Sequence, residues 1–177
     1  MMRRLLIVVM ALVISQAVLG ASKQEIDARV SAALQTLYES QPAGRELAQN
    51  AKGLLVFPRV IKAGFGLGGE YGEGALLVDG NAVQYYRITA LSVGFQAGGQ
   101  AKNEVMMFMT QSALDQFRAS EGWEAGVDGS VAVIEFGVGK DIDTNNIKDP
   151  IIAFVYGNRG LMYDLSVEGS KFWKINK

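Results

Sequence analysis

Three glycines in the segment IKAGFGLGGEYGEG have the spacing of a loop that binds dinucleotide phosphates. Gly64, Gly66 and Gly69 spell GxGxxG, and this motif binds a pyrophosphate when a strand precedes it and a helix follows. In that setting, free N–H groups in the first turn of the helix hold the anion. Here the residues after Gly69 continue in a strand-like pattern toward a turn at Asp79-Gly80. Because no helix is predicted there, we interpret the match as accidental.

The same segment has a second interpretation, as a strand with a bare face. Gly64, Gly66 and Gly68 alternate with Phe65 and Leu67, so in a strand the three glycines share one face and leave it without side chains. A bare face permits a strong bend, or the close approach of another strand, a helix or a flat ligand. We interpret these glycines as close-packing positions, with a ligand contact as the alternative.

Side chains suited to catalysis are scarce. The chain has no histidine and no cysteine, which excludes imidazole acid–base chemistry, thiol chemistry and the usual zinc ligands. Glu121, Glu124 and Asp128 could serve as the paired carboxylates of a hydrolase, but the solvated end of a strand explains them equally well. We therefore predict a protein that is not an enzyme, with hydrolysis as the weakest alternative.

A calcium loop is the only metal site that the sequence suggests. The segment DIDTNN, Asp141 to Asn146, offers oxygen ligands at its first, third and fifth positions. An EF-hand loop also needs glycine at its sixth position and glutamate at its twelfth. These positions hold Asn146 and Ile152. We interpret the segment as a polar loop and predict no metal and no cofactor.

Basic residues flank the glycine-rich segment. Lys52, Arg59 and Lys62 lie close in sequence to Phe57 and Phe65. Cations beside exposed aromatic rings suit a phospholipid headgroup at a membrane surface. An ordinary solvated sheet edge is the alternative. We take these five residues as the candidate lipid-binding site.

The first residues have the layout of a secretory signal peptide. Arg3 and Arg4 precede an uncharged apolar run, Leu5 to Leu19, and the small residues Gly20 and Ala21 follow it. A basic start, an apolar middle and a small-residue exit are the three parts of such a leader. The sequence therefore predicts a signal peptide over 1–21 and a single domain over 22–177, periplasmic or secreted after cleavage near Gly20 or Ala21. An uncleaved membrane anchor is the alternative, although the run is short for a membrane span.

The charge of the remaining chain argues against bulk electrostatic binding. Without Arg3 and Arg4, fifteen basic residues stand against eighteen acidic ones, a net charge of about −3. A weakly acidic surface does not attract nucleic acid or an anionic bilayer as a whole. We expect no nucleic-acid partner, and any anionic partner must bind at a local patch.

The pattern of elements predicts an α+β fold. Ser22 and Glu25 spell a capping box at the start of a helix within 22–40, whose apolar residues share one face. A second helix is expected within 42–53, with Pro42 near its start and Gly53 as its stop, and a third within 110–120, with Thr110 or Ser112 as its cap. Between and after them come strand-like runs, with hairpin turns predicted at Asp79-Gly80 and at Asn158-Arg159-Gly160. A further alternating run, LMYDLSVEG, is expected to form a strand over 161–169. We predict N-terminal helices packed on a largely antiparallel, strongly curved or barrel-like sheet.

Several longer motifs resemble one family. In order, they are AKGLLVFPRVIKAGFGLGGEYGEG, GFQAGGQAKNEVMMFMTQSALDQF, GVDGSVAV and PIIAFVYGNRGLMYDLSVEGSKF. Together they are similar to the SYLF lipid-binding domain family, from about Leu34 to the end of the chain. That family includes eukaryotic proteins that bind phosphoinositides, a yeast protein that binds actin filaments, and many secreted bacterial proteins. The resemblance implies a non-enzymatic, lipid-associated module.

These observations lead to one functional expectation and one alternative. We expect a secreted protein of the bacterial envelope that binds phospholipid or the membrane surface. The alternative is a structural or interaction protein of the envelope, whose sheet binds another protein.

Overall fold

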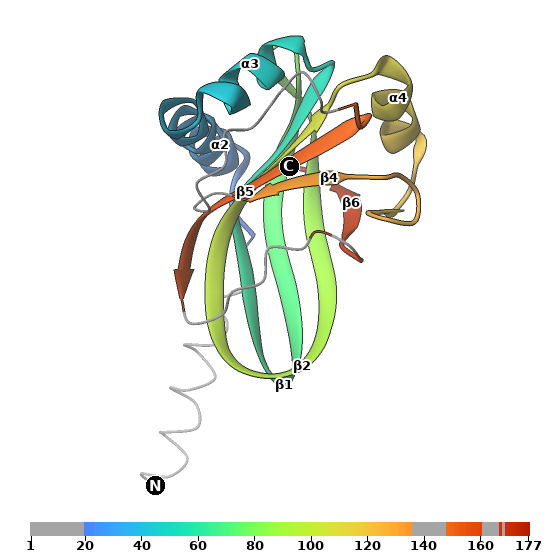
Figure 1. The fold of residues 1–177 in the computed structure, drawn as a ribbon. Helices are drawn as coiled ribbons and strands as arrows, with labels where there is room; N and C mark the ends of the chain where they lie inside the picture. The colour runs from blue at the N-terminus through green and yellow to red at the C-terminus, as the bar shows by residue number, and fades with distance from the viewer. Residues whose placement is uncertain (1–19, 136–147, 161–166, 168) are drawn as a thin grey trace, which may run out of the picture.

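The computed structural model of the chain describes residues 20–135, 148–160, 167 and 169–177, and the side chains of 65–67, 92–98, 135 and 158–160 lie outside this description. Two helices, α2 (Lys23–Ser40) and α3 (Pro42–Asn50), lie on one face of a strongly curved sheet. A third helix, α4 (Gln111–Ala119), lies on the other side of the sheet from α2 and α3 (Figure 1). The α+β class and the curved, mostly antiparallel sheet are confirmed. Residues 1–19 of the predicted leader fall outside the described residues.

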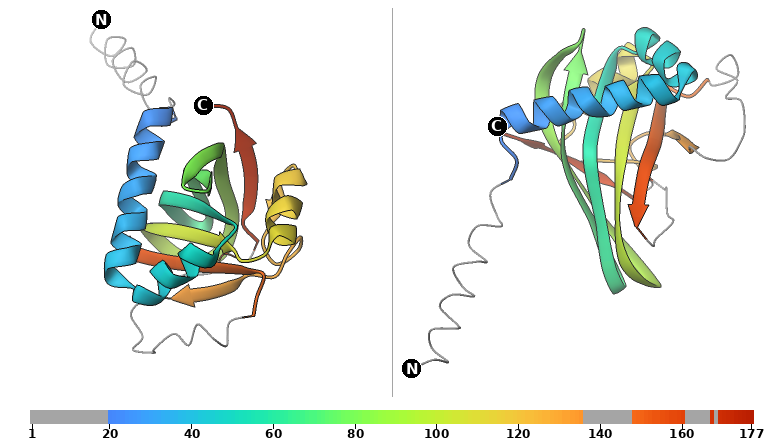
Figure 2. Two further views of the ribbon diagram at one scale, coloured as in Figure 1. Left: turned by 90° about the horizontal axis from the view of Figure 1, so that it is seen from above. Right: turned by 90° about the vertical axis from the view of Figure 1, so that its left-hand side faces the viewer.

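The helix α2 begins and packs as its sequence predicts. Ser22 is the N-cap, and its hydroxyl accepts a hydrogen bond from the Glu25 N–H at 3.2 Å, which satisfies one of the free donors of the first turn. Its buried residues recur every three or four positions and are Ile26, Val30, Ala33 and Leu37. Figure 2 shows α2 lying across the strands of the sheet, so this apolar stripe covers the sheet face.

The centre of the fold is one long hairpin. The strands β1 (Gly53–Val78) and β2 (Asn81–Phe108) pair antiparallel from the turn to their far ends, where Gly53 lies opposite Phe108. Asp79 and Gly80 form the turn with positive φ values of 50° and 77°, the backbone that a two-residue hairpin needs. The predicted turn at Asp79-Gly80 is confirmed.

The hairpin bends back near its middle, so that each strand has two legs (Figure 1). The legs of β1 are residues 53–63 and 69–78, and those of β2 are 81–91 and 99–108. Glycines lie opposite one another at the bend, where Gly64 pairs with Gly98 and Gly66 with Gly94. Paired glycines remove side chains from both strands, which permits the strong bend expected of a glycine-rich strand.

Close packing between the two legs of β1 occurs at glycines that the sequence analysis did not single out. A Cβ on Gly72 would lie 2.9 Å from the Arg59 carbonyl oxygen, and one on Gly74 would overlap the Val56 carbonyl oxygen. The two legs of β1 therefore touch backbone to backbone. The close packing predicted for Gly64, Gly66 and Gly68 stays a prediction.

Four shorter strands complete the sheet. They are β3 (Trp123–Glu124), β4 (Ala132–Glu135), β5 (Ile151–Gly160) and β6 (Lys171–Ile175), and the order is β3-β6-β2-β5-β4 with β1 also paired to β2. The β4–β5 pair is parallel, and the other pairs are antiparallel. The predicted turn at Asn158-Arg159-Gly160 is wrong, because these residues continue β5 and Arg159 pairs with Ala101. Most of the predicted strand 161–169 falls outside the described residues.

Two apolar cores lie on opposite faces of the sheet. The outer core lies under α2 and α3 and uses sheet residues such as Val56, Tyr85, Val105, Met107 and Phe154. The inner core lies on the other face with α4, and its main members are Leu55, Phe57, Leu76, Tyr86, Met106, Phe108, Phe117, Trp123 and Phe172. Alternation along the strands explains the two sets, since neighbouring residues point to opposite faces.

Candidate functional site

The predicted basic cluster does not form one patch. Lys52 is exposed just before β1, and its N–H donates to the Phe108 carbonyl oxygen at 2.7 Å. Arg59 is also exposed, but it lies seven positions after Lys52, which corresponds to roughly 20 Å along a strand. Lys62 is buried, with 3% of its surface exposed. The expectation of three cations at one headgroup site is therefore wrong.

The aromatic part of that prediction is also corrected. Phe57 is fully buried, and its ring packs against Phe172 with centroids 5.6 Å apart. It belongs to the inner core and is not available to a lipid. The side chain of Phe65 lies outside the described part of the structure. Of the five predicted site residues, Lys52 and Arg59 are exposed, on separate parts of the molecule.

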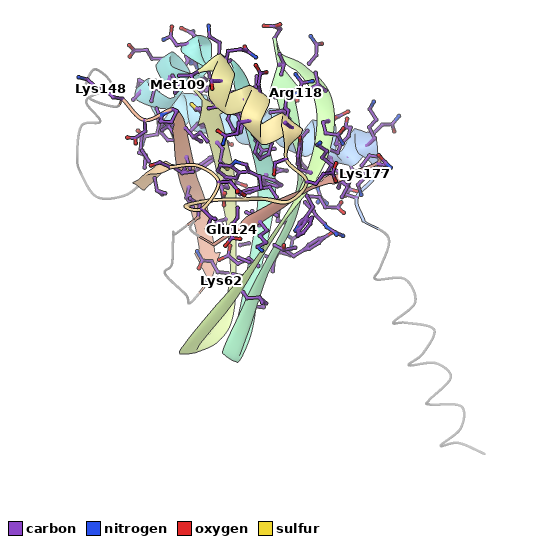
Figure 3. The ribbon with its side chains drawn as sticks, turned by 90° about the vertical axis from the view of Figure 1, so that its right-hand side faces the viewer. Lys62, Met109, Arg118, Glu124, Lys148 and Lys177 are labelled. Atoms are coloured by element: carbon purple, nitrogen blue, oxygen red, sulfur yellow. The ribbon has the colours of Figure 1, made fainter. Side chains whose placement is uncertain are left out.

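Lys62 belongs to a buried cluster of charges on the inner face of the sheet. Its Nζ lies 3.2 Å from Glu70 Oε1, and Lys102 Nζ lies 3.2 Å from the other oxygen of Glu70. Glu104 lies 3.8 Å from Lys102. Figure 3 shows Lys62 toward the bent end of the hairpin, away from α4. Glu70 lies on the second leg of β1. Lys62 lies on the first leg of β1, and Lys102 lies on the second leg of β2, which pairs with that first leg. These ion pairs therefore join the two halves of the bent hairpin.

Glu104 is the most strongly perturbed member of this cluster. Burial raises the pKa of Glu104 to about 7. The positive charge of Lys102 lowers this pKa, and the negative charge of Glu70 raises it further. Among the residues that the structure describes, neither of its carboxylate oxygens has a hydrogen-bond partner, and the same holds for the side-chain amide of buried Gln100. Buried polar atoms without partners are costly, so this cluster is a strained part of the inner face.

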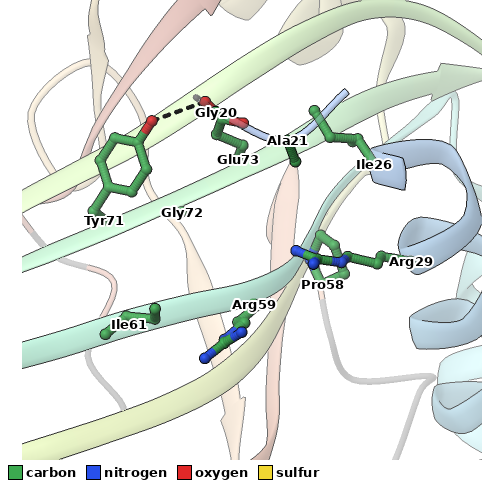
Figure 4. Close-up of a pocket in the computed structure, with 10 residues that line it drawn as sticks. All are labelled: Gly20, Ala21, Ile26, Arg29, Pro58, Arg59, Ile61, Tyr71, Gly72 and Glu73. Atoms are coloured by element: carbon green, nitrogen blue, oxygen red, sulfur yellow. Dashed lines mark hydrogen bonds between the residues drawn. The ribbon is translucent and has the colours of Figure 1, made fainter. Parts of the chain in front are cut away.

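A groove opens on the outer face, between the N-terminus of α2 and the two legs of β1 (Figure 4). Its volume is about 520 Å³. Ile26, Ile61 and Tyr71 supply apolar surface, and Arg29 and Arg59 supply positive charge. The full lining is Gly20, Ala21, Ile26, Arg29, Pro58, Arg59, Ile61, Tyr71, Gly72 and Glu73.

The charged residues of the groove differ in whether they are paired. Arg29 forms an ion pair with Glu25 one turn earlier in α2. Glu73 accepts hydrogen bonds from the Tyr71 hydroxyl at 2.8 Å and from Lys177 Nζ at 2.9 Å. Arg59 has no ion pair or hydrogen bond from its side chain within the described ranges. It is therefore the groove cation most available to an anion.

Apolar side chains extend the groove along the outer face. Ile61 is 42% exposed, Tyr71 is 49% exposed and Leu91 is 93% exposed. Leu91 lies opposite Gly69, and Tyr71 lies opposite Thr89, so Leu91 and Tyr71 are diagonal neighbours on one face of the hairpin. The sequence analysis missed these three residues, although their alternation with buried positions in the strands was a usable signal.

The acidic candidates have structural partners. Glu124 forms an ion pair with Lys171 at 3.1 Å, and Glu121 forms one with Lys174 at 3.6 Å. Asp128 accepts a hydrogen bond from the Glu124 N–H at 2.7 Å and so holds a turn. The segment proposed as a calcium loop, 141–146, lies outside the described residues. In the part that is described, no three acidic side chains gather as metal ligands would.

Two further features of the described chain bear on ligand classes. The strand β1 continues through Gly64, Gly66 and Gly69 to Val78, so no helix N-terminus follows the GxGxxG spelling, as predicted. Within the described residues, we find no helix with the length and apolar character that a membrane crossing requires.

Comparison with known proteins assigns the chain to a family. No curated protein matches it. A family model described as "Ysc84: Las17-binding protein actin regulator" matches residues 89–176, from the first leg of β2 to the end of β6. This is the SYLF family, an actin-binding and lipid-binding domain family. The matched part contains most of β2, with Leu91 and the buried Gln100, Lys102 and Glu104, and the chain belongs to the SYLF family.

Proposed function

We propose that this chain is a non-enzymatic protein of the bacterial envelope that binds anionic lipid at the membrane surface. The observation that carries the proposal is the outer groove, where the exposed guanidinium of Arg59 lies beside exposed Ile61 and Tyr71. A cation next to apolar side chains suits an anionic headgroup and the first part of its acyl chain. Membership of a lipid-binding family supports this assignment.

Export is part of the same proposal. The leader over 1–21 supports secretion or transport to the periplasm, with cleavage near Gly20 or Ala21. In that setting, the protein meets a membrane surface outside the cytoplasm and does not meet cytoplasmic actin. A lipid partner therefore fits this chain better than actin does.

Vesicle sedimentation tests the groove. We expect the protein to sediment with vesicles of phosphatidylglycerol in phosphatidylcholine at low salt and to be released as salt increases. Each basic residue near an anionic surface contributes about 1 kcal/mol, so Arg59→Gln should weaken binding about fivefold. Combining it with Tyr71→Ser should abolish sedimentation, because the apolar contact is then lost as well.

Lys52→Gln is the matched control. It removes one exposed positive charge, as Arg59→Gln does, but at a position roughly 20 Å along the strand direction from the groove. Its binding should equal that of the wild type. Equal losses in both variants would show that only net charge matters, and wild type that stays in solution would refute the lipid proposal.

A protein partner is the second candidate. The family description names a binding protein and an actin regulator, and the 93% exposed Leu91 offers an apolar contact for a protein as well as for a membrane. Co-purification from the native envelope separates the two. A stoichiometric protein that remains bound after the lipid is extracted would favour this candidate.

A further inference from the structure

Glu73 lies where the start of the processed chain would be. Its carboxylate accepts hydrogen bonds from the Tyr71 hydroxyl and from Lys177 Nζ, and the backbone N–H of Ala21 also hydrogen-bonds to it. Figure 4 shows Gly20 and Ala21 beside Glu73 at the rim of the groove. Burial raises the pKa of Glu73, but the bonds from Lys177 and Tyr71 outweigh burial and lower it overall. The carboxylate is therefore charged at neutral pH.

The peptide bond between Gly20 and Ala21 is a suitable cleavage point, and cleavage there would leave the new N-terminus, Ala21, beside Glu73. A Cβ on Gly20 would lie 2.6 Å from Glu73 Oε1 and 2.8 Å from Lys177 Nζ, so the chain passes close against the carboxylate. Signal peptidases cut after a small residue, and Gly20 is one. Hydrolysis of this bond adds water, releases the Gly20 carboxylate with the leader, and leaves Ala21 with an amino group that is protonated at neutral pH.

We propose that Glu73 is the binding site for the free α-ammonium group of Ala21 in the processed protein. The proposal rests on the export proposed above. The neutral N–H that Ala21 now donates would become a charged donor, and hydrogen bonds between charged groups are shorter and stronger than neutral ones. A carboxylate can accept about four hydrogen bonds, so the contacts from Tyr71 and Lys177 can remain.

The position of the new ammonium group makes such a partner necessary. Ala21 directly precedes Ser22, the N-cap of α2. The N-terminus of a helix carries a partial positive charge, which repels a cation placed there. Glu25 in the first turn offers negative charge, but Arg29 already pairs with it. Glu73, from the second leg of β1, supplies the remaining negative charge, so processing would tie the start of α2 to the sheet.

The test compares a free amine with a blocked one. Residues 21–177 contain every helix and strand described, and this chain can be released from a fusion protein so that it begins at Ala21. We expect acetylation of the Ala21 amine to lower the Tm by about 2–4 °C, the shift that the loss of one charged interaction gives in a domain of this size. In Glu73→Gln, acetylation should leave the Tm unchanged.

Two outcomes would overturn the proposal: no change in Tm on acetylation of the wild type, or the same decrease in wild type and in Glu73→Gln. If Glu73→Gln does not fold, the pKa of the amine, measured by NMR on the unblocked wild type, decides the question. A value above the ordinary range of an α-amine supports the pair, and a value within or below it refutes the pair. The intact mass of protein from the native host reports on export, and vesicle sedimentation reports on lipid binding, so failure of either is seen separately.

Discussion

At the scale of single residues, the charges of this protein divide between an exposed groove and a buried cluster. Arg59 and Lys62 are three positions apart in sequence, yet one is exposed and the other is almost fully buried. A bulge between Phe57 and Val60 changes which residues face inward. Arg59 and Lys62 are an odd number of positions apart, so strand alternation alone places them on opposite faces, and the predicted cluster combined residues from both faces.

Glu104 leads to a prediction about pH. Its pKa is raised by burial to about 7, whereas an unfolded glutamate titrates near 4.3. Between these values the folded protein binds more protons than the unfolded one, so the free energy of unfolding falls as pH rises from about 4.5 to 7. Glu104→Gln should remove this dependence on pH, whose total a pKa difference of this size limits to about 4 kcal/mol. Urea unfolding across this pH range measures it.

The control for that prediction is the exposed Glu121, whose replacement by Gln should leave the slope as it is in the wild type. Glu121 is an acidic residue with an ion pair to Lys174 at the surface, and such pairs contribute little to stability. A Glu104→Gln protein that keeps the wild-type pH dependence would contradict the assignment of a raised pKa to Glu104.

At the scale of elements, the fold depends on β1 packing against itself. Gly74 is the position with least space, because a Cβ there would overlap the Val56 carbonyl oxygen and lie 2.7 Å from the Phe57 ring. We expect Gly74→Ala to destabilise the protein by about 1–3 kcal/mol or more, as overpacked sites do. Thermal unfolding measures the loss.

Gly69→Ala is the matched control in the same strand. Its added Cβ would lie 3.7 Å from the Ala90 carbonyl oxygen, an ordinary contact, and Gly69 has no positive φ. This variant should be as stable as the wild type, or more stable by up to about 1 kcal/mol, since alanine restricts the unfolded chain. Equal destabilisation of both variants would mean that the bend itself requires glycine throughout.

Local signals predicted the elements better than their arrangement. The N-caps Ser22 and Thr110, the start of α3 at Pro42 and the turn at Asp79-Gly80 were all readable, because each depends on a few neighbouring residues. The contact of Gly74 with Val56 could not be predicted from the sequence, because it depends on where a long strand folds back. The groove was missed for the same reason, as its residues come from α2 and from both legs of β1.

At the scale of the whole molecule, two cores share one sheet. Leu37 of α2 lies in the outer core, and Trp123 lies in the inner core with α4. The strand β2 contributes to both, with Met107 on one face and Met106 on the other. Neither core can be lost without exposing the other face of the same strands, so we expect the described domain to unfold in one step.

This cooperativity gives a prediction for Leu37→Ala. The variant should lose about 2–5 kcal/mol, the cost of a large-to-small change in a core. Its tryptophan fluorescence, to which Trp123 contributes from the opposite core, and its circular dichroism should still change at one shared urea concentration. Leu91→Ala is the control and should stay within about 0.5 kcal/mol of wild type, because Leu91 is exposed. Separate transitions for the two probes would contradict a shared sheet.

The length of the β1–β2 hairpin has a consequence for how the chain folds. Pairing that begins at Asp79 and Gly80 can extend outward one pair at a time until Gly53 meets Phe108, and each new pair then closes only a short loop. The hairpin is complete in sequence before β5 and β6, so it can form before these two strands pair with β2. A slip of one residue at the turn would turn every side chain to the opposite face. Lys62 and Glu70 would then face solvent, and Ile61 and Tyr71 would face the interior.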